Sequence, residues 1–176
     1  MIEEIELKKV SGVATITINR PQKRNAINYD GWIELQRLAN AVDQDKDIKV
    51  VILQGSGQDA FSSGADIADF DNYRSNSEKA IIYAKAFEGA MNAIEAISKP
   101  TISSIKGYCI GGGCEMSMAT DMRFAADNAT FGIPVAHLGI LIGYSEMTRL
   151  LRLVGAGNAS YSVSYTHLTL PTSDLV

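Results

Sequence analysis

The residues best suited to chemistry are a run of three glycines and the glutamate two positions after it. The glycines, at 111–113, follow a β-rich stretch at 100–104 and precede a segment of helical character. A strand that ends in such a triplet and opens a helix leaves several backbone N–H groups without an intrahelical acceptor, which is the geometry of an anion or oxyanion site. Glu115 falls in the first helical turn, where the dipole favours a carboxylate, and can face the same cavity. The same spacing also fits a tight packing turn that the glutamate caps.

The hydrophobic pattern predicts alternating strands and helices around this turn. Strands are predicted at 5–7, 13–19, 49–54, 100–104, 122–126 and 130–131, and helices at 28–45, at 78–97 and from Ser145 onward. The continuously apolar run 50–53 is typical of a strand covered on both faces, and the second helix is predicted to turn Ile82, Met91 and Ile94 inward. Repeated β-then-α order predicts an α/β fold with right-handed crossovers.

Length, charge and cysteine usage restrict the class of protein. At 176 residues with a net charge of −4, the chain suits one domain, and its scattered Lys and Arg residues argue against a nucleic-acid partner. No apolar run reaches membrane-spanning length and the first residues are acidic, so we expect no membrane partner, no signal peptide and a cytoplasmic location. Cys109 and Cys114 are too few for a disulfide framework and lack partners at zinc-ligand spacing, so no metal site is predicted.

Four motifs, in order along the chain, resemble one known family. They are Asn19-Arg20-Pro21 with Asn25-Ala26, the segment Phe61 to Ile67, the segment Gly107 to Glu115, and Phe131-Gly132-Ile133-Pro134 with Leu138-Gly139. Together they are similar to the enoyl-CoA hydratase/isomerase (crotonase) superfamily. The resemblance covers residues 1–160 and implies a crotonase-like spiral of βαβ units that binds acyl-CoA thioesters. It also implies a homotrimer or a hexamer as the assembly of the full-length protein.

The resemblance implies where a substrate binds. The backbone N–H groups of Ala65 and Gly112 are expected to hold the thioester carbonyl, whose oxygen gains charge in an enolate, so that preorganised donors stabilise the transition state more than the substrate. The acyl-CoA is expected to contact a larger set of residues, namely Lys23, Arg24, Ser63, Ala65, Asp66, Ile67, Ala68, Gly112 and Val135. Lys23 and Arg24 also fit an ordinary solvated pair. Coenzyme A arrives with the substrate, so no separate cofactor is expected.

The acid/base residues depart from the family pattern. Hydratases of this family use two glutamates, one after the glycine triplet and one after the Phe-Gly-x-Pro motif. The first is Glu115 here, but the second position holds Val135, which cannot transfer a proton. Glu146 is the candidate replacement, although the helix dipole also explains a glutamate in the first turn of a helix. His137 is expected to pack in an apolar loop. Asp66 is expected to accept hydrogen bonds from backbone amides.

The last segment, 161–176, is rich in serine and threonine, has no helical period and is unlike the family. We therefore expect an incomplete crotonase-like domain at 1–160, followed by an artefactual or disordered tail.

The predicted function is hydration of a 2-enoyl-CoA, with an enolate held by Ala65 and Gly112 and with Glu115 as acid/base. An enoyl-CoA isomerase, other acyl-CoA enolate chemistry and a non-catalytic acyl-CoA-binding homologue are alternatives, because Val135 removes one carboxylate. A nicotinamide site at 55–60 lacks the helix and the acidic residue that it needs. A serine hydrolase is disfavoured because the chain contains no Gly-x-Ser-x-Gly motif.

Overall fold

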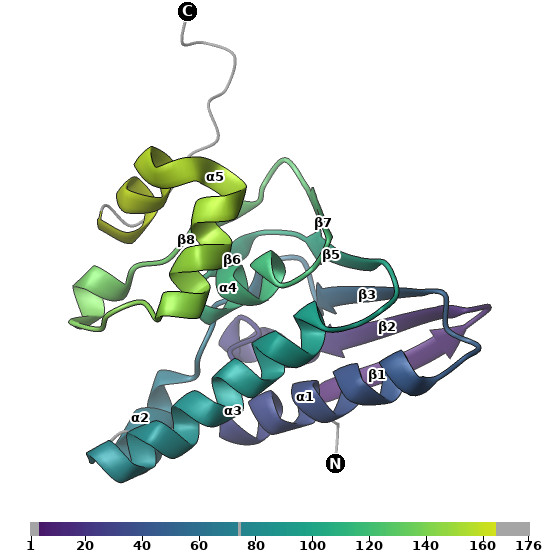
Figure 1. Cartoon of the computed structure of the whole chain (residues 1–176), viewed down its shortest axis with the longest axis horizontal. Helices are drawn as coiled ribbons and strands as arrows, with labels where there is room; N and C mark the ends of the chain where they lie inside the picture. Colours follow the sequence, from purple (N-terminus) through teal and green to yellow (C-terminus); the bar gives the residue numbers. More distant parts are fainter. Residues whose placement is uncertain (1–3, 74, 165–176) are drawn as a thin grey trace, which may run out of the picture.

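The described part of the chain folds into two β-sheets with helices packed around them (Figure 1). The computed structural model describes residues 4–73 and 75–164. The strands are β1 Ile5–Val10, β2 Val13–Ile18, β3 Val50–Gly55, β4 Ala60–Ser62, β5 Thr101–Ile105, β6 Tyr108–Ile110, β7 Met122–Ala125 and β8 Thr130–Gly132. The α-helices are α1 Tyr29–Gln44, α2 Phe70–Tyr73, α3 Ser77–Glu95, α4 Gly112–Met118 and α5 Tyr144–Ser164, with 3-10 turns at Pro21–Lys23, Ile67–Asp69 and Val135–Leu138.

The larger sheet has five strands in the order β1-β2-β3-β5-β7. β1 and β2 form an antiparallel hairpin, in which Ile5 pairs with Ile18, and the other neighbours are parallel. Parallel neighbours require crossovers, and α1, α3 and α4 lie in the connections between them. β3 is not covered on both faces as predicted, because Val51 and Leu53 are buried while Ile52 is only half-buried. One face of this sheet is therefore the core face.

Helices α1 and α3 lie side by side in Figure 1 and form most of the core against that face. The side chain of Asn28 caps α1 by accepting a hydrogen bond from the N–H of Gly31, as its position before an amphipathic segment predicts. The prediction for α3 was wrong at Ile82, which is 45% exposed. Its neighbour Tyr83 is buried instead and accepts a hydrogen bond from Trp32 Nε1 at 3.0 Å. This bond joins the two helices within the core.

The smaller sheet contains β4, β6 and β8, all parallel. Two of its strands correct the sequence analysis. The strand that leads into the glycine triplet is β6, which is separated from β5 by a turn and belongs to the other sheet. β4 lies in a segment where no strand was predicted, and it pairs with β6 through Ser62 and Cys109. The motif segments Phe61 to Ile67 and Gly107 to Glu115 therefore contain neighbouring strands.

Helix α5 is interrupted at Gly155, where φ is +74°. It begins at Tyr144, one residue before the predicted start, and continues to Ser164. Residues 161–164, which were expected to begin a non-helical tail, are therefore helical. The remainder of that segment, 165–176, lies outside the described residues. α5 packs against α4, the helix that the glycine triplet opens.

Candidate active site

A cavity of about 610 Å³ lies where the glycine triplet, α3 and the start of α5 meet. It is lined by residues of the segment after β4, of α3, of β6 and α4, and of the connection from β8 to α5. The lining is mainly apolar, and the carboxylates that reach it are Glu88, Glu115 and Glu146. Among the described residues its one basic side chain is His137. The cavity is therefore an apolar space with acidic groups at its wall.

Two backbone segments come into direct contact at this cavity, and glycines make the contact possible. A Cβ atom on Gly64 would lie 2.7 Å from the nitrogen of Gly112 and 2.8 Å from the oxygen of Ile110. The φ angle of Gly64 is +89°, which also favours glycine. A Cβ atom on Gly113 would collide with Ser62. The two segments that the motifs singled out are therefore packed backbone against backbone.

The N–H groups of Ala65 and Gly112 both belong to this contact. Ile27 donates to the carbonyl of Gly64 at 2.8 Å and accepts from the N–H of Asp66 at 2.9 Å. Because these bonds flank Ala65, its own N–H points away from Ile27. Gly112 is the first residue of α4, where an N–H has no intrahelical acceptor. Within the described part of the chain, neither N–H group donates a hydrogen bond.

Two buried glutamates at helix starts reach the same cavity. Glu115, in the first turn of α4, is 7% exposed, and Glu146, in the first turn of α5, is 4% exposed. Oε2 of Glu146 is buried and has no hydrogen-bond partner within the described part of the chain. Gly143 makes room for it, since a Cβ there would collide with that oxygen. A buried carboxylate oxygen without a partner is costly in a purely structural role, and this favours a ligand or a water there.

The structure brings most of the predicted site residues to this cavity. Ser63, Ala65, Ile67, Gly112, Glu115, Val135 and Glu146 all line it. Val135 begins the 3-10 turn Val135–Leu138, and His137 from the same turn is exposed and lines the cavity, whereas packing was expected. Lys23, Arg24, Asp66 and Ala68 do not line it, and their contact with coenzyme A stays a prediction.

Sequence reasoning missed Glu88, which lines the cavity from α3. Ala80 and Ala84 line it from the same helix. These three residues follow one another at intervals of four, so they share a helix face. That spacing was the available signal, but it was hidden because two of the three residues are alanines.

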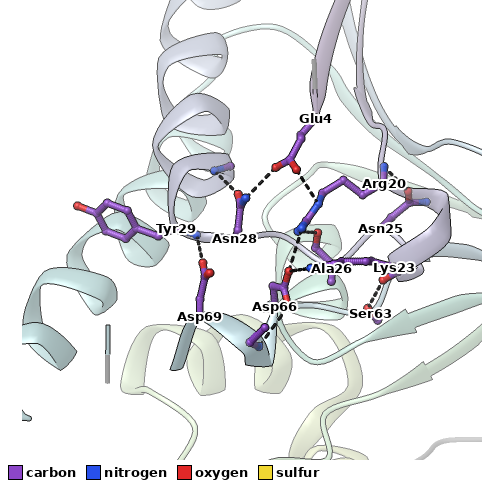
Figure 2. Close-up of polar contacts among 12 residues, drawn as sticks. Glu4, Arg20, Lys23, Asn25, Ala26, Asn28, Tyr29, Ser63, Asp66 and Asp69 are labelled. Carbon is purple, nitrogen blue, oxygen red and sulfur yellow. Dashed lines mark hydrogen bonds and ion pairs between the residues drawn. The ribbon is translucent and has the colours of Figure 1, made fainter. Parts of the chain in front are cut away.

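A charged network holds the segment that carries Ala65 (Figure 2). Asp66 Oδ2 lies 2.9 Å from Nη2 of Arg20 and 2.9 Å from Nζ of Lys23, and its Oδ1 accepts from the N–H of Ala68 at 3.2 Å. Burial alone would raise the pKa of Asp66, but the hydrogen bonds from Lys23, Arg20 and Ala68 outweigh it and hold the pKa below its ordinary value. Arg20 also donates to the carbonyl of Ala26 at 2.7 Å. The network thus fixes this loop from one side.

Arg24 takes a different position from Lys23. Its backbone is left-handed, with φ of +50°, and its guanidinium lies 5.1 Å from the centroid of the Tyr108 ring. The N–H of Ser63 donates to the carbonyl of Arg24 at 2.9 Å. Arg24 and Tyr108 therefore form a cation–π pair beside the segment that leads to Ala65.

Comparison with known proteins identifies the family of this arrangement. The profile of the enoyl-CoA hydratase/isomerase family matches residues 8–172, which is nearly the whole chain. The chain belongs to this family. The resemblance read from the four motifs is thereby confirmed, and the match extends past the boundary expected at residue 160.

Individual members of the enoyl-CoA hydratase/isomerase family are similar over most of the chain. The crotonyl-CoA hydratase of Syntrophomonas wolfei is 40% identical over 157 residues, covering 89% of this chain and 60% of that protein. The peroxisomal Delta(3,5)-Delta(2,4)-dienoyl-CoA isomerase of Arabidopsis thaliana is 33% identical over 168 residues, covering 90% of this chain and 60% of that protein. The chain thus spans about 60% of the length of these relatives.

Solved structures of the family confirm the crotonase-like α/β fold. An enoyl-CoA hydratase/carnithine racemase from Magnetospirillum magneticum superposes with a TM-score of 0.88 at 34% identity, over 92% of this chain and 61% of that one. Within residues 4–73 and 75–164, no helix has the length and apolar character needed to cross a membrane. The same residues contain no group of three or more acidic, histidine or cysteine side chains that is arranged to hold a metal ion.

Proposed function

We propose that the protein is an enoyl-CoA hydratase, which adds water across the 2,3 double bond of an acyl-CoA thioester. The observation that carries this proposal is the cavity shared by two buried carboxylates, Glu115 and Glu146, and by two backbone donors, those of Ala65 and Gly112. The relative from Syntrophomonas wolfei is named a crotonyl-CoA hydratase, which supports a short 2-enoyl-CoA as the first substrate to test.

The thioester carbonyl is placed between the N–H groups of Ala65 and Gly112. When a nucleophile attacks the β-carbon, charge moves to this oxygen, and donors fixed in advance stabilise that charge without having to reorganise. Main-chain donors suit the task because the contact between Gly64 and Gly112 fixes their separation. Loss of one such donor costs about 10² to 10³ in rate in well-studied cases.

Glu146 has the role that the second glutamate has in hydratases of the family. The position of that glutamate is occupied by Val135 here. One of the two carboxylates, Glu115 or Glu146, accepts a proton from water as the water oxygen bonds to the β-carbon and the enolate forms, while the other accepts a hydrogen bond that orients this water. The protonated carboxyl then delivers a proton to the α-carbon as the enolate collapses to the thioester. The sum is the addition of one water molecule, and both carboxylates end as they began. Positioned proton transfer of this kind contributes about 10² to 10⁴ in rate.

Coenzyme A is proposed to enter with the substrate along Lys23, Arg24 and the segment from Ser63 to Ala68. The half-exposed ammonium of Lys23 and the guanidinium of Arg24 supply positive charge beside that segment, and this charge complements phosphate groups. The proposed reaction uses main-chain donors and carboxylates, and it calls for neither a separate cofactor nor a metal.

Two further features are also proposed, of which the first follows from the family resemblance. They are assembly into a homotrimer or hexamer and a cytoplasmic location. Light scattering of the purified full-length protein tests the first, and fractionation of cells that express it tests the second. A monomer over the whole concentration range, or recovery outside the cytoplasm, would contradict them.

The decisive experiment measures hydration of crotonyl-CoA by the full-length protein as loss of enone absorbance. It also follows exchange of the α-proton in deuterated water. Glu115→Gln and Glu146→Gln are each expected to lower kcat by about 10² or more, because one substitution removes the group that transfers the proton and the other removes the carboxylate that orients the water. Glu78→Gln, at an exposed residue in the first turn of α3, is the matched control and should keep wild-type kcat.

The other outcomes separate the alternatives. Exchange of the α-proton without hydration would point to an isomerase or to other enolate chemistry. Binding of CoA esters with neither hydration nor exchange would favour a non-catalytic binding protein. Wild-type kcat in Glu146→Gln alone would leave Glu115 as the single acid/base group and would reject the role proposed for Glu146.

A further inference from the structure

We propose that Arg149 is a positioning residue that sets the location of the Glu146 carboxylate in the cavity. The inference rests on the proposed function, since it assigns a support to the second acid/base group. Arg149 follows Glu146 by three residues on α5, so the two side chains leave the same side of the helix. Both are buried, at 7% and 4% exposure, whereas Ser145 and Leu151 of the same helix are exposed.

Arg149 fastens α5 to α3. Its Nε and Nη2 lie 2.9 and 2.6 Å from Oε2 of Glu95, and Nη2 also donates to Oδ1 of Asn92 at 2.8 Å. Glu95 and Asn92 belong to the last turn of α3. Charge-assisted hydrogen bonds of this kind are short and directional, and a guanidinium whose head is fixed from two sides has little freedom to move.

The carboxylate of Glu146 needs such external support. Its Oε2 is buried without a hydrogen-bond partner among the described residues. The location of this oxygen therefore depends on where the helix places the side chain rather than on bonds that the oxygen makes itself. The helix in turn follows a connection that contains Gly139 and Gly143, and it is interrupted at Gly155. Between these points the Arg149 contacts fasten the turn that carries Glu146 to α3.

A structural role alone would also make Arg149 sensitive to mutation. The test must therefore distinguish a structural role from a positioning role. If Arg149 acts through Glu146, removing Arg149 matters only while Glu146 keeps its carboxylate. The effect on kcat should then disappear when Glu146 is already disabled, because residues that act as one unit are not additive. A general loss of stability would lower kcat by the same factor in both backgrounds.

The experiment is a double-mutant cycle on the full-length protein with crotonyl-CoA. Arg149→Met is expected to lower kcat by about 10², since a misplacement of about 1 Å is enough for such a loss. KM should stay within about threefold of wild type, because the thioester contacts are unchanged. In the Glu146→Gln background, Arg149→Met should change kcat by less than about twofold. Arg152→Met, at an exposed arginine of the same helix, is the control and should leave kcat unchanged.

Each outcome supports or contradicts the positioning role of Arg149. Unchanged kcat in Arg149→Met, or an equal loss in both backgrounds, overturns the positioning role while leaving the proposed function in place. Wild-type kcat in Glu146→Gln removes both this inference and the role of Glu146 in the proposed function. If Arg149→Met does not fold, Glu95→Gln and Arg149→Lys enter the same cycle, because each weakens the contact to α3 without leaving a cavity. Additivity with Glu146→Gln in both of these variants overturns the inference.

Discussion

A methyl group on Gly64 would lie 2.7 Å from the backbone nitrogen of Gly112, although the two residues are 48 positions apart in the sequence. This is closer than non-bonded carbon and nitrogen atoms come in well-packed proteins. The contact fixes the distance between the two segments that carry the proposed carbonyl-binding N–H groups. Substitutions that disturb it are therefore expected to affect activity directly.

Gly64→Ala should lower hydration kcat by about 10² to 10³. The added methyl group separates the two segments and so moves one carbonyl-binding N–H group out of position. It should also reduce the free energy of unfolding by about 1 to 3 kcal/mol, given its φ of +89°. Gly57→Ala is the matched control, since Gly57 has a φ of +78° but only an ordinary contact with Pro21. Steady-state kinetics and urea unfolding measure the two effects. Equal losses of kcat in the two variants would show that backbone conformation, not the contact, is responsible.

Val135→Glu should restore hydration to an enzyme disabled by Glu146→Gln. Position 135 lines the same cavity and is where the family pattern has its second glutamate. A carboxylate returned there should recover at least tenfold of the lost kcat, since proton transfer by a positioned group is worth about 10² to 10⁴. Val135→Gln in the same background has nearly the same size and no acid/base function. Recovery by both variants, or by neither, would contradict the exchange of roles between the two positions.

Asp66 should make folding stability depend on acid pH. Its folded pKa lies below the ordinary value of 3.8, so its contribution is fully present above that value and is lost as the pH falls through the folded pKa. The difference in unfolding free energy between wild type and Asp66→Asn should be constant above about pH 5 and shrink below about pH 4. Urea unfolding from pH 7 to pH 2 measures it. Asp127→Asn, at an exposed turn, is the control, and a difference independent of pH at Asp66 would be the contrary result.

Lys99 should contribute to stability without affecting activity. Its ammonium donates to the carbonyls of Val42, Asp43 and Asp45, at 2.5, 2.6 and 2.8 Å, and so caps the end of α1. Lys99→Met should lower the free energy of unfolding by about 1 to 2 kcal/mol, because it removes donors and a positive charge from the helix terminus. Lys46→Met, at an exposed lysine nearby, should change it little. A fall in kcat for Lys99→Met in the folded protein would contradict the purely structural role.

Local chemistry made much of the fold predictable. The side chain of Asn28 and the alternation in β2 each act within a few residues, and the elements that they predict are present. Ile82 and Tyr83 show where local patterns are insufficient. Both are apolar enough for the core, and the bond from Trp32, which is 51 positions away from Tyr83, accompanies the burial of tyrosine. β4 could not be predicted from the local sequence either, because it is a strand only through its pairing with β6.

The candidate site likewise contains residues that local sequence predicts and residues that only the tertiary structure reveals. The glycine triplet and Glu115 are adjacent in the sequence, so their common place at the cavity was predictable. Glu146 was ambiguous, because a first-turn glutamate has a local explanation that is independent of any cavity. Only the arrangement of α5 against α4 shows that its carboxylate is buried with an unpartnered oxygen. Glu88 lies on a third helix, α3, so its place at the cavity also follows only from the tertiary structure.

The proposed site joins parts that differ in how they tolerate mutation. The donors of Ala65 and Gly112 belong to the main chain, so they survive any substitution that preserves the path of the backbone. The carboxylates are side chains, and a single codon change removes or creates one. Proton-transferring residues can therefore migrate between neighbouring turns during evolution while the carbonyl-binding geometry persists. A valine at 135 with a glutamate at 146 is what such drift would leave behind.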